Sequence, residues 1–104
     1  MAAVYSRRFS DGLYGGDNTS HALFTVPAGR VYVVRFVTVW SYTHPSTAFI
    51  QGPSGSRWAF YTSTADSESF NADVRLVLTA GEVLSWYLYS GSWHVSTHGF
   101  DFAA

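Results

Sequence analysis

Four histidines and several carboxylates are the residues of this chain best suited to metal or acid–base chemistry. His94 and His98 fall on one face of a predicted terminal strand, and Asp101 and Glu82 come within possible reach of that face. Residues four apart on a strand are separated by about 13 Å, which is too far to bind one ion unless the strand bends. The sequence also has no His-x-His pair. We therefore expect no metal site and no cofactor.

Serine and histidine also lie close together, at Ser96 and His98, as nucleophilic catalysis would require. The chain has no Gly-x-Ser-x-Gly turn, however, and alternating Ser and His residues are normal on the polar face of a sheet. Asp66, Glu68 and Asp73 surround one loop but lack the glycine and the alternating ligands of a calcium-binding loop. We interpret these carboxylates as turn caps and solvated side chains. The sequence thus predicts a protein that is not an enzyme.

Aromatic residues give the strongest functional signal, because they make up 18% of the chain and crowd three predicted strands in its second half. Alternation along the strand at 83–89 turns Trp86 inward with Leu84 and Leu88, while Tyr87 and Tyr89 face the other way. Exposed Trp and Tyr can anchor a protein interface or stack on sugar rings, and we favour the interface. The candidate interface or sugar-stacking residues are Trp58, Tyr61, Tyr87, Tyr89 and Trp93.

Composition limits the partners of the chain. Only 12% of its 104 residues are charged, and the formal net charge is -1. This charge balance gives no positively charged surface that could bind a phosphate backbone, so we expect no nucleic-acid partner. No apolar run approaches the roughly 20 residues of a membrane span, and the N-terminus lacks the apolar stretch of a signal peptide. We expect a soluble protein that is made in a cytoplasm and binds no membrane.

Residues 31–40, VYVVRFVTVW, form the clearest predicted strand, because almost all of them are β-branched or aromatic. Strict alternation places on one face Tyr32, Val34, Phe36, Thr38 and Trp40. Similar patterns predict strands near 3–9, 21–26, 46–51, 57–62, 68–78, 83–89 and 93–102. Short strands joined by close turns, with no amphipathic helix between them, predict an all-β fold: an antiparallel two-sheet sandwich, jelly-roll-like, of about eight strands.

The segment at 10–20, SDGLYGGDNTS, interrupts this pattern with three glycines. We expect it to be a flexible loop that joins an N-terminal arm to the rest of the chain. The predicted organisation is therefore an N-terminal arm and flexible loop over residues 1–20, reaching away from the body, and a β-sandwich domain over residues 21–104.

Two stretches of the sequence resemble small β-sandwich proteins from the structural gene clusters of tailed bacteriophages. In that family a VPAG turn opens a long strand with the pattern Val-Val-Arg-x-Val-x-Val, which residues 26–29 and 33–39 match. A later apolar-x-x-Gly-Glu turn and a Gly-aromatic strand ending are matched by residues 78–82 and 99–102. The resemblance implies a virion component such as a minor tail protein, a head decoration protein or a fibre module.

We therefore expect a non-enzymatic structural component of a phage virion, made in the host cytoplasm, that mediates protein–protein assembly as a capsid decoration, minor tail or fibre module. Because the chain has few charges, little electrostatic repulsion keeps its copies apart. Because its core is small, many aromatic residues must lie outside the core, where a partner can cover them. The expected partners are the chain's own copies, as a trimer by analogy with fibres and spikes, and a neighbouring capsid or tail protein. The alternative is a small carbohydrate-binding, lectin-like module for host attachment.

Overall fold

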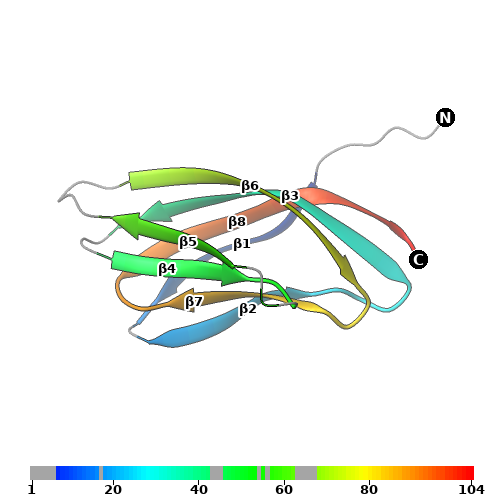
Figure 1. The fold of residues 1–104 in the computed structure, drawn as a ribbon, viewed down its shortest axis with the longest axis horizontal. Helices are drawn as coiled ribbons and strands as arrows, with labels where there is room; N and C mark the ends of the chain where they lie inside the picture. Colours follow the sequence, from blue (N-terminus) through cyan, green and yellow to red (C-terminus); the bar gives the residue numbers. More distant parts are fainter. Residues whose placement is uncertain (1–6, 17, 43–45, 54, 56, 63–67) are drawn as a thin grey trace.

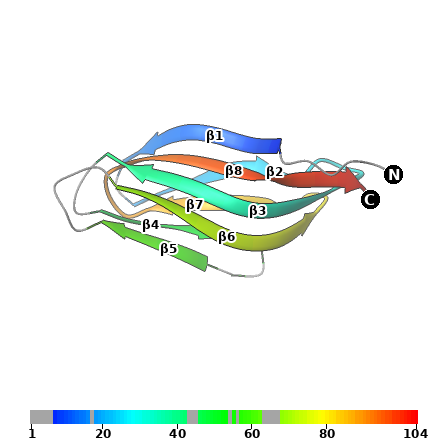
Figure 2. The same cartoon turned by 90° about the horizontal axis from the view of Figure 1, so that it is seen from above.

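The computed structural model describes residues 7–16, 18–42, 46–53, 55, 57–62 and 68–104 of the chain. They form two four-stranded antiparallel sheets packed face to face, which confirms the predicted all-β sandwich (Figure 1; Figure 2). Sheet 1 has the strand order β1-β8-β3-β6, and sheet 2 has the order β2-β7-β4-β5. The strands are β1 (Arg7–Gly15), β2 (Thr19–Thr25), β3 (Arg30–Ser41), β4 (Ser46–Gln51), β5 (Arg57–Thr62), β6 (Glu68–Thr79), β7 (Val83–Leu88) and β8 (Ser92–Ala103).

The connections between the strands follow a simple rule. β1 pairs with β8, β2 with β7, β3 with β6 and β4 with β5, so the first half of the chain pairs antiparallel with the second half. Pairings of β3 with β8 and of β4 with β7 then complete the two sheets. The chain is thus a long antiparallel ribbon rolled into two layers, which is jelly-roll-like connectivity.

Side chains that alternate along the strands fill the space between the sheets. Leu84, Trp86 and Leu88 of β7 are all buried, as predicted from the alternation of that strand. The ring of Trp86 meets the ring of Trp93 edge to face, with centroids 5.7 Å apart. This contact joins the two layers, because Trp86 belongs to sheet 2 and Trp93 to sheet 1.

A β-bulge in β3 interrupts the alternation that the sequence predicted for this strand. The register shifts between Val34 and Phe36 against both neighbouring strands, and Arg35 is an extra residue relative to β8. One extra residue reverses the side to which every later side chain in the strand points. The prediction for β3 is therefore correct before the bulge and wrong after it.

The reversal moves aromatic residues to the surface. Alternation had placed Phe36 and Trp40 on the same face as Tyr32. In the structure Tyr32 faces the core, while Phe36 and Trp40 are exposed on the outer face of sheet 1. Val37 and Val39 are buried in their place. The core keeps its apolar lining because valines on the opposite face of the strand replace the lost aromatic residues.

The N-terminal prediction also needs correction. β1 pairs along most of its length with β8, so most of the predicted flexible loop at 10–20 is strand, and the described part of residues 1–20 does not reach away from the body. The physical reason is that β1 packs: Phe9 and Tyr14 contact the core, and Ser10 shares a 2.6 Å hydrogen bond with buried Thr97 of β8. Residues 1–6, which include most of the strand predicted at 3–9, lie outside the described residues.

The two turns that match the family pattern lie side by side. The N–H of Val26 donates to the carbonyl of Glu82, and the N–H of Gly81 donates to the carbonyl of Val26, both at 2.9 Å. Gly29 and Gly81 have φ angles of 79° and 84°, a region that glycine adopts without strain. The Glu82 carboxylate closes its own turn by accepting hydrogen bonds from the N–H and the hydroxyl of Thr79. These paired turns fix the ends of β2, β3, β6 and β7 relative to one another.

Candidate functional site

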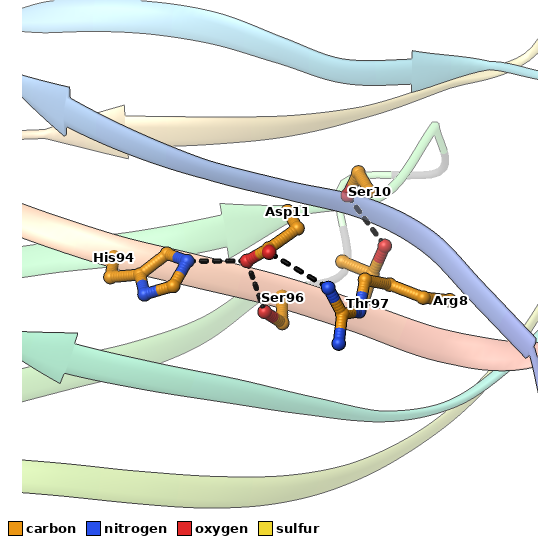
Figure 3. Close-up of polar contacts among 6 residues, drawn as sticks. All are labelled: Arg8, Ser10, Asp11, His94, Ser96 and Thr97. Carbon is orange, nitrogen blue, oxygen red and sulfur yellow. Dashed lines mark hydrogen bonds and ion pairs between the residues drawn. The ribbon is translucent and has the colours of Figure 1, made fainter.

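A group of polar side chains, here called the Asp11 cluster, joins β1 to β8 on the outer face of sheet 1 (Figure 3). The cluster consists of Arg8, Asp11, His94 and Ser96. His94 Nε2 donates to Asp11 Oδ1, and the hydroxyl of Ser96 donates to the same oxygen at 2.7 Å. Arg8 Nη1 donates to the other carboxylate oxygen at 2.9 Å. The strand register accounts for the arrangement, because Asp11 lies directly opposite Ser96.

The Asp11 cluster has the residue types of a catalytic triad but a different order of contacts. In a nucleophilic site the histidine lies between carboxylate and serine and accepts the hydroxyl proton. Here Asp11 lies between His94 and Ser96, and the serine donates to the carboxylate. The hydrogen bonds from Ser96 and then His94 lower the pKa of Asp11 below its ordinary value of 3.8. The cluster thus binds two strands together and leaves the serine oxygen without a base.

The residues that the sequence offered as metal ligands are used in other contacts. Asp101 accepts hydrogen bonds on one oxygen from Arg30 Nε and Nη2, at 3.0 and 2.6 Å, and on the other from Arg7 at 3.2 Å. Glu82 closes a turn, as described above. Within the described ranges, no group of three His, Cys, Asp or Glu side chains is placed to hold one ion.

His98 contacts an aromatic ring on the same face. Its imidazole stacks on the ring of Phe36, with centroids 4.8 Å apart and planes 14° from parallel. Burial, followed by the nearby Arg8 guanidinium, lowers the pKa of His98 below its ordinary value of 6.5, while Asp11 acts in the opposite direction. A neutral imidazole on a phenyl ring is an apolar contact rather than an acid–base site.

The remaining carboxylates of the sequence prediction do not converge on a calcium site in the described residues. Asp66 lies outside those residues, and Glu68 begins β6. Asp73 pairs with Arg75 at 3.2 Å, and both side chains are well exposed. In the part of the chain that the structure describes, there is also no helix long and apolar enough to span a membrane.

The five predicted surface aromatics fall into two groups. The prediction of Trp93 as a surface residue is wrong, because its side chain is fully buried between the sheets. Trp58 points toward the core from β5 and is only partly buried. Both occupy inward positions of their strands. Tyr61, Tyr87 and Tyr89 lie on the outer face of sheet 2, where Tyr87 and Tyr89 contact each other.

Tyr87 and Tyr89 contact Phe49 of β4, and Tyr61 lies on the neighbouring strand β5. We call Phe49, Arg57, Tyr61, Tyr87 and Tyr89 the tyrosine patch. The Phe49 ring stacks on Tyr87 with centroids 5.1 Å apart and meets Tyr89 at 5.8 Å. The Arg57 guanidinium lies over the same ring, 4.6 Å from its centroid. Sequence reasoning missed Phe49 and Arg57, because only the register of β4 with β5 and β7 brings them beside the tyrosines.

The larger apolar surface lies on sheet 1. Six of the eight exposed large hydrophobic residues belong to this sheet or directly follow its strand β3. We call them the apolar face: Leu13, Phe36, Trp40, Tyr42, Val77 and Phe102. The rings of Trp40 and Tyr42 stack with centroids 5.2 Å apart. This surface was not predicted, because the bulge that exposes Phe36 and Trp40 leaves no mark in the alternation of β3.

Comparison with known proteins gives distant likenesses to solved structures and no match by sequence. No family model matches the chain, and no curated protein matches it. Among solved structures, the chain is similar to a chain in the structure of the infectious bursal disease virus Gx strain, with 14% sequence identity and a TM-score of 0.44. The match covers 98% of this chain and 32% of that one, so this chain spans about a third of the length of its structural neighbour. A likeness at this level carries no inference about function.

Proposed function

We propose that the chain is a non-enzymatic structural component of a phage particle and that it assembles through the apolar face of sheet 1. The observation that carries the proposal is the concentration of exposed hydrophobic side chains on one sheet. Exposed hydrophobic side chains that gather on one sheet mark protein contacts, and here they lie on both sides of the polar row of Asp11, Ser96 and Thr38. The resemblance of the turn and strand motifs to tailed-phage structural proteins supports the class of particle.

The size of this face suits a stable contact. The fold is 48 Å long, and the four strands of sheet 1, spaced about 4.8 Å apart, give its outer face a width of roughly 19 Å. Stable protein interfaces bury about 800 Å² on each partner. One sheet therefore offers enough area for a complete interface without help from the other.

The charges on sheet 1 favour copies of the same chain as partners. Arg8 pairs with Asp11 at 2.9 Å, and Arg75 pairs with Asp73 at 3.2 Å. Each of these four charges is compensated within its own chain, so they add little repulsion when two copies of the face meet. Arg35, exposed at the bulge of β3, adds one positive charge. The trimer expected from the sequence remains a prediction, as does a second contact with a neighbouring capsid or tail protein.

Mass spectrometry of intact particles tests the role. Particles are purified on a density gradient from the host that carries the gene, and their proteins are quantified against a known capsid protein of the same particle. The proposal expects the chain at a fixed, reproducible ratio to that capsid protein. Particles that lack the chain, or carry it only in traces that vary between preparations, would overturn a virion role.

A further inference from the structure

We propose that the tyrosine patch on the outer face of sheet 2 binds a carbohydrate that carries carboxylate groups. The patch and the apolar face belong to different sheets, so this binding goes beyond the proposed assembly role and does not depend on it. The patch combines exposed aromatic rings with one arginine. That combination suits a ligand that has flat apolar surfaces, a rim of hydroxyl groups and a negative charge.

Strand register arranges the patch in successive rows across β7, β4 and β5. The first row carries Tyr89 and Tyr61, the second Tyr87 and Phe49, and the third Gln51 and Arg57. Side chains two residues apart on one face of a strand are separated by about 7 Å. The tyrosine rings and the guanidinium are therefore spread along one direction, as the neighbouring units of a single oligosaccharide chain would require.

The tyrosine rings supply the apolar contact. Tyr61 is 62% exposed and Tyr89 is 46% exposed. A sugar ring presents C–H groups on its face and hydroxyl groups at its edge, so it can lie flat on an aromatic ring while the tyrosine O–H reaches the edge. Ala59 lies between Tyr61 and Arg57 on β5 and projects only a methyl group. It leaves the ring on one side and the guanidinium on the other open to a ligand.

Arg57 determines the charge of the ligand. The contact with the Phe49 ring positions the guanidinium before any ligand binds. Among the described strand residues that point outward from sheet 2, Arg57 is the single charged side chain, and no ion pair within the described part of the chain neutralises it. A guanidinium can bind a carboxylate through two parallel hydrogen bonds. Gln51, directly opposite Arg57, adds an amide for neighbouring hydroxyl groups.

Affinity electrophoresis in gels that contain a dissolved polymer tests this specificity. Polygalacturonate and polysialic acid are the two carboxylated glycan probes. Methyl-esterified polygalacturonate keeps the sugar ring but has lost the charge, and poly-L-glutamate keeps the carboxylates but has no sugar ring. We expect the chain to be retarded by at least one carboxylated glycan and by neither control polymer.

Variants connect this binding to the patch. Arg57→Gln and Tyr89→Ser should each weaken the affinity for the retarding glycan about tenfold. Arg75→Gln is the matched control for Arg57→Gln, because the Arg75 side chain is also exposed, at 74%, but lies on sheet 1 and outside the apolar face. Tyr61→Ser is a second probe of the patch if Tyr89→Ser alters the circular dichroism spectrum of the fold. Arg75→Gln should leave the affinity unchanged.

Several results would overturn the inference. Failure of both carboxylated glycans to retard the chain would exclude the ligand class. Equal retardation by the methyl ester would remove the role of the charge, and equal retardation by poly-L-glutamate would point to a peptide carboxylate instead of a sugar. Equal weakening by Arg75→Gln and Arg57→Gln would mean that the binding does not reside in the tyrosine patch.

Discussion

Gly99 of β8 lies against the backbone carbonyl of Val33 in β3 so closely that a Cβ atom at position 99 would be 1.9 Å from the carbonyl oxygen. On the other side, the same Cβ would be 2.9 Å from Cε2 of Phe9. The close approach occurs where Gly99 pairs with Val34, immediately before the bulge at Arg35. Only a residue without a side chain fits here, because one of the two neighbours is backbone and cannot rotate away.

Gly99→Ala should therefore destabilise the fold by about 3 kcal/mol or more, the upper part of the range for overpacked sites. The matched control is Gly29→Ala. Gly29 has a φ of 79° but nothing within 4 Å of its added Cβ, so its substitution should cost only about 1 kcal/mol, the strain of an alanine in the left-handed region. Chemical denaturation of both variants measures the difference. Equal losses would show that β3 and β8 separate easily at this point.

The bulge at Arg35 also explains why the sequence could predict the sheets but not the outer face. The burial of Trp86 follows directly from the alternation of β7, and it was predicted correctly. Apart from Arg35, residues 31–40 have valines at odd positions and aromatic or β-branched residues at even positions, so the two faces of β3 look equally suited to a core. Nothing in that pattern indicates where one extra residue reverses the strand, and Phe36 and Trp40 were assigned to the wrong side.

Contacts between residues that are distant in the sequence are the second feature that the sequence could not predict. Asp11 and His94 lie 83 positions apart, and their contact depends on the pairing of β1 with β8. The glycines near Asp11 predicted a loop, whereas inward-facing Phe9 and Tyr14 hold the segment in the sheet. The three tyrosines of the patch were among the predicted surface aromatics, Tyr87 and Tyr89 from the alternation at 83–89. Arg57 was not predicted, because its neighbours are determined by register alone.

The Asp11 cluster should make the fold more sensitive to acid. The pKa of Asp11 is lowered in the folded state, so the carboxylate contributes stability that is complete above its ordinary value of 3.8 and is lost as the pH falls through the lower, folded-state value. Asp11→Asn removes this titration. Thermal melts across the acid range should show a steeper loss of melting temperature below pH 3.8 for the natural chain than for Asp11→Asn. Parallel curves would contradict a stabilising role for the cluster.

Asp101 should matter more to stability than Asp73, although both carboxylates pair with arginine. The Asp101 side chain is 11% exposed and binds two guanidinium groups, whereas the Asp73 side chain is 59% exposed and binds one. Asp101→Asn should cost about 1.5 to 3 kcal/mol, because it removes charge-assisted hydrogen bonds at a partly buried site. Asp73→Asn should change stability by about 0.5 kcal/mol or less. Urea denaturation compares the two, and similar losses would show that solvent screens Asp101 as fully as Asp73.

Sedimentation velocity at micromolar concentration tests the apolar face of sheet 1 most directly. The natural chain should sediment with a mass two or three times that of the monomer. The measured mass decides between a dimer and a trimer. Trp40→Ser and Phe102→Ser should shift the population to monomer, because each removes an exposed hydrophobic side chain from the apolar face, while Tyr89→Ser on sheet 2 should not. A natural chain that stays monomeric at every concentration, or one that Tyr89→Ser dissociates as readily as Trp40→Ser, would contradict assembly of its own copies through sheet 1.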